Sequence, residues 1–404
     1  MPQALTQHAG FDKRTGLAFI VAFGIVSLFA DMAYEGMRGI SGPFLGTLGA
    51  SGTIVGIVAG TGELVGYLLR LGSGRLAERT HLYWPITLAG YGVQMAAVPA
   101  LALAGNWWAA AIFIVLERTG KALRSPAANT MMSRAGEQIG QGWAFGLHEA
   151  LDQTGALAGP LIAALVLARH HDYRAAFLWL GVPAVLTLVT VAVVRAGFPS
   201  AGHVSRANNL GADGMRLSRA FWLYAASAAL VAFGFADYPL IAYHYAQSHT
   251  VTPGLIPVFY AGAMGASGAG SLLFGRWFDR QGLSVLVPGL LLGAVVAPLV
   301  FIGGFALALI GTLAWGLALG VHDAVMNAAI ARMVSEHARA RAYGIFTAIY
   351  GIAWFAGSAL LGVLYDVSIP ALVAVATAAE LLALIPLILT LRTIEQPPKT
   401  PVGS

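Results

Sequence analysis

The sequence has no cysteine and few charged residues. None of its 404 residues is cysteine, which excludes disulfides, thiolate metal ligands and cysteine nucleophiles. Only 10% of the residues are Asp, Glu, Lys or Arg, against roughly 25% in a soluble domain, and 58% are hydrophobic. This composition is typical of a polytopic membrane protein.

Motifs for soluble chemistry are also missing. The chain has no Gly-rich phosphate loop that ends in Lys-Ser or Lys-Thr, so ATP hydrolysis is not indicated. The pair His170 and His171 lacks the spacing of a metal site, and no nucleophile elbow of a hydrolase occurs, so we expect no enzyme. The net charge of +5 comes from bases at the ends of apolar segments, which membrane topology explains without a nucleic-acid partner.

Apolar segments long enough to cross a bilayer recur along the whole chain. Each such segment needs about 20 predominantly apolar residues. Twelve segments fit, at residues 17–43, 51–71, 84–104, 107–131, 142–168, 175–196, 219–246, 253–276, 284–303, 306–331, 341–365 and 369–391. The sequence therefore predicts an all-α membrane protein with twelve transmembrane helices.

The basic residues of the connections are unevenly distributed between the two sides. With the N-terminus inside, one side carries Arg75, Arg79, Arg134, Arg195, Arg206, Arg216, Arg219, Arg276, Arg280, Arg332, Arg339 and Arg341. The other side carries only Arg169 and Arg174 in a loop. The positive-inside rule then places both termini in the cytoplasm, and we expect a multi-pass protein of the inner membrane.

The chain divides into two halves that repeat each other. A polar stretch at 198–218 reads as a linker between six-helix bundles at 1–197 and 219–404. The tripeptide Phe-Ala-Asp ends at Asp31 and again at Asp237, and similar loop sequences begin at Gly74 and Gly275. Two homologous halves with a site between them is the plan of secondary transporters.

The two loop sequences carry a family resemblance. Residues 275–282, Gly-Arg-Trp-Phe-Asp-Arg-Gln-Gly, resemble the Gly-x-x-x-Asp-Arg-x-Gly motif of the major facilitator superfamily. The first copy departs from the motif, because Glu78 replaces its Asp and His81 its second Gly. Residues 155–160 resemble the antiporter motif without its final Gly pair. The resemblance implies two pseudo-symmetric six-helix bundles and alternating access around a central cavity.

A second, finer resemblance rests on two further stretches. The runs at 118–126 and 145–152 look like those of a bacterial branch that includes drug- and nickel-resistance exporters.

The first segment carries charges where lipid would surround them. Asp31 and Glu35 are four residues apart, and Glu35 and Arg38 three, so all three share one helix face. A charge at mid-bilayer costs about 2.5–3.5 kcal/mol, so this face must contact other helices or a wet cavity. We predict that Asp31 and Glu35 couple transport to protons or cations. Alternatively, Glu35 pairs with Arg38 and holds the outer mouth together.

Further ionisable residues lie in the second, fourth and fifth segments of the first half. They are Glu63, Glu117, Arg118, Lys121, Arg124, His148, Glu149 and Asp152. Glu63 is either a functional acid or a packed hydrogen-bonding residue. Glu117 and Lys121 have the spacing of an intrahelical pair. The surplus bases are expected to pair with Glu149 and Asp152, in a network whose protonation biases inward and outward states. A static network and an anionic substrate are the alternatives.

The second half has fewer ionisable groups. Asp237, His322 and Asp323 lie within its apolar segments, and His244 lies near the end of one. Because Asp237 repeats Asp31, both are predicted to face the central cavity. The two histidines are either part of this cavity or packing residues. Trp354 is among the aromatic residues that could line it.

The loop motifs are predicted to gate the cytoplasmic side. Their residues are Gly74, Arg75, Glu78, Arg79, Gly275, Arg276, Asp279 and Arg280. An acid at a helix end can cap a helix or pair with an arginine and hold the gate shut in one state. The alternative is a plain positive-inside anchor.

The functional prediction is proton-coupled export of a small organic molecule by a monomer in the bilayer, with the proton gradient as energy source and no cofactor. Carboxylates in the membrane indicate proton coupling, and the antiporter-like motif indicates export. A divalent-metal exporter using Asp31, Asp237 and His244 ranks second, because their oxygen and imidazole ligands suit such ions. An organic anion that neutralises the bases of segment four ranks third. A sensor or an intramembrane enzyme is the alternative from another class.

Overall fold

The computed structural model describes residues 12–137, 139–202, 217–334 and 339–395, which are helical with no strand among them. The first half contains α1 (Lys13–Thr47), α2 (Gly52–Thr80), α3 (Tyr83–Ala100), η1 (Leu101–Leu103), α4 (Trp107–Gly136), α5 (Gln141–His170), α6 (Tyr173–Gly197) and η2 (Pro199–Gly202). The second half contains α7 (Arg219–Gly234), α8 (Tyr238–Gln247), α9 (Ile256–Gln281), η3 (Gly282–Val285), α10 (Leu286–Phe301), α11 (Phe305–Met333), α12 (Arg339–Val367) and α13 (Ile369–Glu395). Each of the twelve predicted segments falls on helix, and the seventh falls on two helices, α7 and α8.

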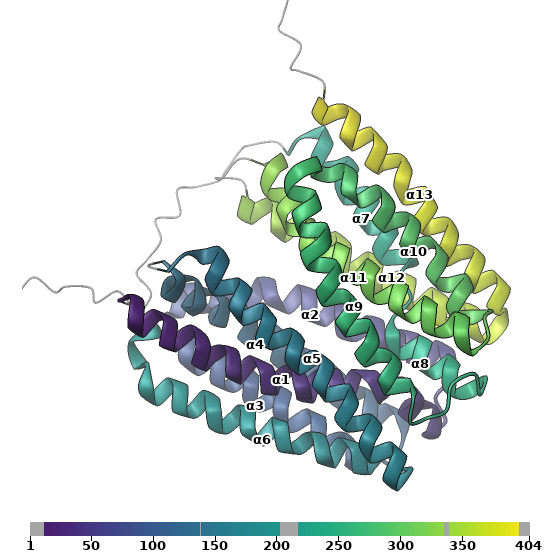
Figure 1. Cartoon of the computed structure of the whole chain (residues 1–404), viewed down its shortest axis with the longest axis horizontal. Helices are drawn as coiled ribbons and strands as arrows, with labels where there is room; N and C mark the ends of the chain where they lie inside the picture. Colours follow the sequence, from purple (N-terminus) through teal and green to yellow (C-terminus); the bar gives the residue numbers. More distant parts are fainter. Residues whose placement is uncertain (1–11, 138, 203–216, 335–338, 396–404) are drawn as a thin grey trace, which may run out of the picture.

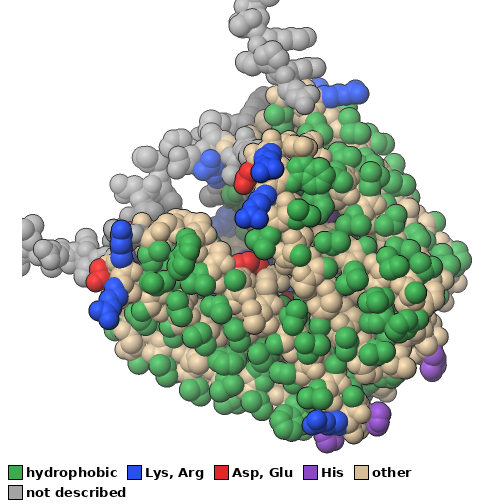
Figure 2. Space-filling model, in the orientation of Figure 1, with side chains coloured by type: hydrophobic (Ala, Val, Ile, Leu, Met, Phe, Trp, Pro, Cys, Tyr) green, Lys and Arg blue, Asp and Glu red, His purple; other side chains and the backbone are tan. Residues whose placement is uncertain are grey.

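Ten runs of the described residues are long and apolar enough to cross a membrane. One of them, Ile256–Phe301, contains both α9 and α10, and α4 is absent because charged residues interrupt its apolar face. Large apolar side chains such as Leu178 and Val193 point outward, and Figure 2 shows hydrophobic side chains over both halves with Lys and Arg at the ends. The protein is therefore a multi-pass membrane protein.

The seventh segment is broken, which the sequence prediction missed. Residues 235–237 separate α7 from α8, and Asp237 is the N-cap residue of α8. Pro239 explains the break, because proline has no N–H to donate and its ring clashes with the carbonyl four residues earlier, at Phe235. The equivalent position in the first half is Ala33, and α1 runs through it without interruption.

The last positions of the two loop motifs both have a positive φ, although their ψ angles differ (19° at His81 and −145° at Gly282). Gly282 has a φ of 66° at the C-cap of α9, and His81 has a φ of 56° at the C-cap of α2. Left-handed backbone favours glycine, which explains why a motif would place Gly there. His81 ends α2 in the left-handed helical region, at some conformational cost for a residue with a side chain.

The two halves contact each other mainly at the end of the bundles remote from the chain termini. There α1 packs against α8 and α2 against α12. A side chain at Gly42 would overlap the Pro239 carbonyl, so this glycine lets α1 and α8 touch. Asp366 of α12 accepts hydrogen bonds from the first backbone N–H groups of α2, at Gly52 (2.9 Å) and Thr53 (2.8 Å). We call this the far end.

Toward the other end, which holds the start of α1 and the end of α13, the halves separate. Figure 1 shows the two groups of helices diverging in this direction, and Figure 2 shows a hollow between them in which acidic side chains are visible. We call this the terminal end. The predicted linker falls mostly on residues 203–216, which lie outside the described residues, so the domain boundaries stay a prediction.

Candidate functional site

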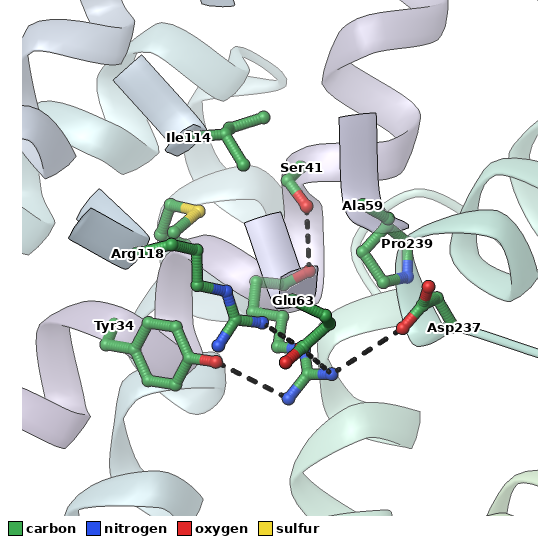
Figure 3. A pocket seen from close by; sticks show the side chains of 10 residues that line it. Tyr34, Ser41, Ala59, Glu63, Ile114, Arg118, Asp237 and Pro239 are labelled. Carbon is green, nitrogen blue, oxygen red and sulfur yellow. Dashed lines mark hydrogen bonds and ion pairs between the residues drawn. The ribbon is translucent and has the colours of Figure 1, made fainter. Parts of the chain in front are cut away.

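A cavity lies between the two halves, midway along the helices. It is lined by Tyr34, Met37, Arg38, Ser41, Ala59, Glu63, Ile114, Arg118, Asp237 and Pro239. Figure 3 shows Glu63 in the middle, with Tyr34 and Arg118 on one side and Asp237 and Pro239 on the other. Its volume of about 20 Å³ leaves room for a water molecule. In this state the site is closed around its own side chains.

Glu63 is shared by two arginines. Its Oε1 lies 2.5 Å from Arg118 Nη2 and 3.3 Å from Arg38 Nη2. The three side chains come from α2, α4 and α1 and are only 11–14% exposed. Charge-assisted hydrogen bonds of this kind are stronger than neutral ones, so two cations compensate one largely buried carboxylate.

Asp237 brings the second half to the same cluster. Its Oδ1 lies 4.0 Å from Arg38 Nη2, which makes an ion pair across the interface between the halves. Trp354 Nε1 (2.9 Å) and Ser358 Oγ (2.5 Å), both of α12, donate hydrogen bonds to the two carboxylate oxygens. The prediction that Asp237 faces the central cavity is confirmed, and Trp354 supports it from behind.

A second pocket continues from the first along α2 toward the terminal end. It is lined by Glu63, Gly66, Tyr67, Arg70, Arg118 and Lys121, so that three bases face one acid. The Arg70 guanidinium lies over the Tyr67 ring, 5.8 Å from its centroid, and its buried Nε has no hydrogen-bond partner in the described structure. This pocket is therefore positively charged, while the first cavity has as many acids as bases.

Asp31 pairs with Lys121 of α4. Lys121 Nζ lies 3.9 Å from Asp31 Oδ1 and 3.8 Å from the centroid of the Tyr34 ring. The ring also faces Arg118, at 4.8 Å, and cation–π attraction of this kind holds both bases against α1. Asp31 thus reaches the site only through Lys121 and lines neither of the two pockets, so the prediction that it faces the central cavity is not supported.

Glu35 has a different partner from the one considered for it. Tyr260 of α9 donates a hydrogen bond to Glu35 Oε2 at 2.5 Å, across the interface between the halves. Arg38 instead forms ion pairs with Glu63 and Asp237. The Glu35–Arg38 pair is therefore wrong, because helices α2 and α8 supply nearer acids.

Glu117 and Lys121 form no direct ion pair, and the base that faces Glu117 Oε2 is Arg118, whose Nε lies 3.9 Å away. Glu117 is fully buried and accepts a hydrogen bond from Gln94 Nε2 of α3 at 2.8 Å. Arg124 donates to Gln94 Oε1 (2.7 Å) and to the Tyr91 hydroxyl (3.1 Å). These contacts join α3 to α4 behind the site and indicate a structural role for Glu117 and Arg124.

The network predicted between α4 and α5 has other partners. Arg118 and Lys121 pair with Glu63 and Asp31, on α2 and α1, and not with α5. His148 Nε2 lies 3.8 Å from Asp152 Oδ2 on the same helix, and the exposed Glu149 accepts a hydrogen bond from Gln153 at 2.8 Å. Acids on α1 and α2 pair with Arg118 and Lys121, while Arg124 still interacts electrostatically with Asp152 of α5.

The histidines of the second half lie away from this cluster. His244 Nδ1 forms a hydrogen bond with the Tyr365 hydroxyl at 3.2 Å, and the His322 ring packs edge-on against Phe235. Asp323 lies in α11, but its side chain is outside the described part. Asp31, Asp237 and His244 do not converge, since the described residues hold no group of three such ligands. The metal site is therefore not supported.

The predicted gating residues lie at the terminal end. The last turns of α2 carry Arg75, Glu78 and Arg79, and those of α9 carry Arg276, Asp279 and Arg280. All six side chains are exposed. Gly74 faces Pro126 of its own half, and the space beside Gly275 is open. The halves are separated at this end, so a gate that closes in another state stays a prediction.

Several residues of the site were not predicted. Gln94, Tyr260, Ser358 and Arg70 contact the charged residues, and Glu380 of α13 is 1% exposed with neither carboxylate oxygen hydrogen-bonded among the described residues. Arg70 carried a signal, because it lies seven residues after Glu63 and so on the same face of the helix. Nothing in the sequence distinguished Gln94, Tyr260 and Ser358 from polar residues that face lipid.

Comparison with known proteins agrees with this architecture. The model of the Major Facilitator Superfamily matches residues 225–404. The uncharacterised protein Mb2288 of Mycobacterium bovis is 39% identical over 373 residues, which cover 91% of each chain. The MFS-type transporter MJ1317 of Methanocaldococcus jannaschii is 26% identical over 283 residues, 66% of this chain and 68% of its own.

Two solved structures share the fold. The nucleoside transporter NupG matches with a TM-score of 0.74 at 11% identity, over 93% of this chain and 100% of its own. The peptide transporter POT matches with a TM-score of 0.73 at 15% identity, over 95% and 99%. Together with the central site between two six-helix halves, these similarities lead to one conclusion: the chain belongs to the major facilitator superfamily and is a membrane transporter, not an enzyme.

Proposed function

We propose that the protein is a proton-coupled secondary active transporter of a small organic molecule, with Glu63 as the coupling acid. The observation that carries this proposal is a largely buried carboxylate, Glu63, held by Arg38 and Arg118 in a cavity between the halves. A buried carboxylate that loses its cations favours the neutral form, so release of either arginine promotes proton uptake. Asp31, which Lys121 holds at 3.9 Å, is the second acid of the coupling machinery.

Alternating access follows from the two ends of the interface. At the far end, Asp366 joins α12 to α2, and the Tyr243 hydroxyl donates to the Ala50 carbonyl at 3.1 Å. The halves separate toward the terminal end (Figure 1). With the termini in the cytoplasm of the inner membrane, as the basic loops favour, this state faces inward. One chain supplies both sides of the cavity, so we take the monomer as the transporting unit.

The direction of transport stays a prediction: the antiporter-like stretch favours export, whereas an acid that takes up its proton when substrate binds favours movement of both in one direction. Gly155 and Gly159 lie against the backbone of α1 near Leu28 and Met32, so this stretch lets α5 approach the helix that carries Asp31. Small residues that bring two helices into contact are typical of membrane interfaces. A resemblance to drug- and nickel-resistance exporters agrees with export and stays a prediction.

Proton movement driven by substrate tests the proposal. The purified protein is reconstituted in liposomes with a pH-sensitive dye inside, and organic acids, amides and amines are added outside one at a time. At least one compound is expected to change the internal pH only in liposomes that contain the protein. Glu137→Gln, which changes an exposed acid at the end of α4, is the matched control and should behave as wild type. Accumulation of a compound without any proton movement would contradict the coupling.

A further inference from the structure

The acids of the central site already have partners. Glu63 is held by two arginines and Asp237 by Trp354, Ser358 and Arg38. A cationic ligand would have to displace a protein cation from each of these carboxylates. The carboxylates of the site therefore offer little opportunity for a cationic ligand to bind.

The bases have unused capacity. Arg70 forms no ion pair with a described residue, and its Nε is buried without a hydrogen-bond partner. The 3.9 Å separation of Lys121 from Asp31 is too long for a hydrogen bond. Arg118 and Glu63 line the same pocket as these two bases. Three guanidinium or ammonium groups around one pocket provide the donors that a carboxylate or phosphonate accepts.

The neighbouring cavity offers an apolar surface. Met37, Ala59, Ile114 and Pro239 contribute to its lining. Glu63 and Arg118 line both spaces, so they separate a positive pocket from a mainly apolar one. If Arg118 leaves Glu63, the two spaces become one site with a charged end and an apolar end.

From this arrangement we infer that the substrate is an organic anion with an apolar body. Its anionic group binds Arg70, Arg118 and Lys121, and its body lies against Met37, Ile114 and their neighbours. This inference rests on the proposed function and names the substrate class of the same site. It differs from the order of substrates that the sequence favoured, in which the anion ranked third.

Binding of the anion is linked to the proton. Glu63 is faced by Tyr34 and Arg38 from α1, Arg118 and Lys121 from α4, Asp237 from the start of α8, and Arg70 from its own helix. An anion that takes Arg118 from Glu63 leaves this carboxylate with one cation instead of two. Glu63 then gains by accepting a proton, so we expect the anion to bind more tightly as the pH falls.

The test uses the full-length purified protein and probes that share one body. Phenylacetate, phenylphosphonate and octanoate are the anions, phenylacetamide is the neutral probe and phenethylamine the cationic one. Since a ligand of the folded state raises the melting temperature, the anions should raise it and the amide and amine should not. Arg70→Gln should weaken anion binding about tenfold or more, because it removes charge-assisted hydrogen bonds, and Arg70→Lys should retain part of it.

A matched control separates charge at the site from charge in general. Arg169→Gln removes an exposed base at the end of α5 and should leave anion binding unchanged. The inference is overturned if no anion of the series binds, if the amine binds more tightly than the acids, or if Arg70→Gln binds anions as wild type does. Proton flux driven only by the amine or amide would overturn the anion and leave proton coupling intact. Anion binding without any proton movement would overturn the proton coupling and leave the anionic substrate class intact.

Discussion

Asp31 lies within the unbroken helix α1, whereas its repeat counterpart Asp237 lies at the break between α7 and α8. Lys121 of the same half faces Asp31 at a distance, while neutral donors on α12 hold Asp237 closely. The difference begins with one residue, Pro239, where the first half has Ala33. The two aspartates therefore occupy equivalent positions in the repeat but have different surroundings.

The same contrast extends to the whole of each half. The bases around the cavities, Arg38, Arg70, Arg118 and Lys121, all come from the first half. The second half supplies one carboxylate, at Asp237, and aromatic and hydroxyl donors behind it. We infer that the first half determines what binds, and that the second half senses binding through the Arg38–Asp237 pair.

Loss of Arg118 should have the largest effect on the first half. Arg118→Gln removes the shorter of the two contacts to Glu63, and removing one partner of a buried pair costs about 3–5 kcal/mol. Thermal unfolding in detergent measures this loss. Adding Glu63→Gln should restore part of the stability, because the unpaired charge disappears. Equal destabilisation by the single and double variants would show that the pair is not coupled.

The two repeated acids should respond differently to the same change. Asp237→Asn weakens charge-assisted hydrogen bonds from Trp354 and Ser358, which are worth about 1.5–3 kcal/mol each. Asp31→Asn breaks an ion pair of 3.9 Å that includes no hydrogen bond, so we expect a smaller loss of stability than for Asp237→Asn. Unfolding of both variants under the same conditions compares them. Equal losses would remove the distinction between the two acids.

Glu380 should respond in the opposite direction, because it is a buried acid of the second half with no hydrogen bond to a described residue. It packs against Gly293 of α10. Glu380→Leu removes an unsatisfied polar group, whose burial costs about 1–3 kcal/mol, so the melting temperature should rise. Proton-coupled transport should be unchanged, and its loss would assign Glu380 to the coupling machinery.

The far-end contact should have the smallest energetic effect. Asp366→Ala removes a helix cap worth about 1 kcal/mol, which shifts the ratio of the two states about fivefold toward those open at this end. The chain has no cysteine, so spin labels attached through Thr47→Cys and Val367→Cys report the distance without background. Asp172→Ala removes a cap within one half and should lower stability without this shift.

The sequence predicted the helices better than it predicted their contacts. Periods of apolar residues located twelve segments and the repeat, because helix length and lipid exposure depend on local composition. The spacing of Glu117 and Lys121 indicated a pair, yet Gln94 and Asp31 on other helices became their partners. Which side chains meet depends on how the helices pack, and this packing cannot be read from a single sequence. The break at Pro239 was in the sequence and was missed.

The most direct test of the coupling role of Glu63 compares exchange with net transport. In liposomes, wild-type protein should move protons together with a bound anion and should also exchange labelled for unlabelled anion. Glu63→Gln mimics the protonated acid, so we expect it to exchange the anion but to move no protons with it. Proton movement by Glu63→Gln at the wild-type rate would contradict the account.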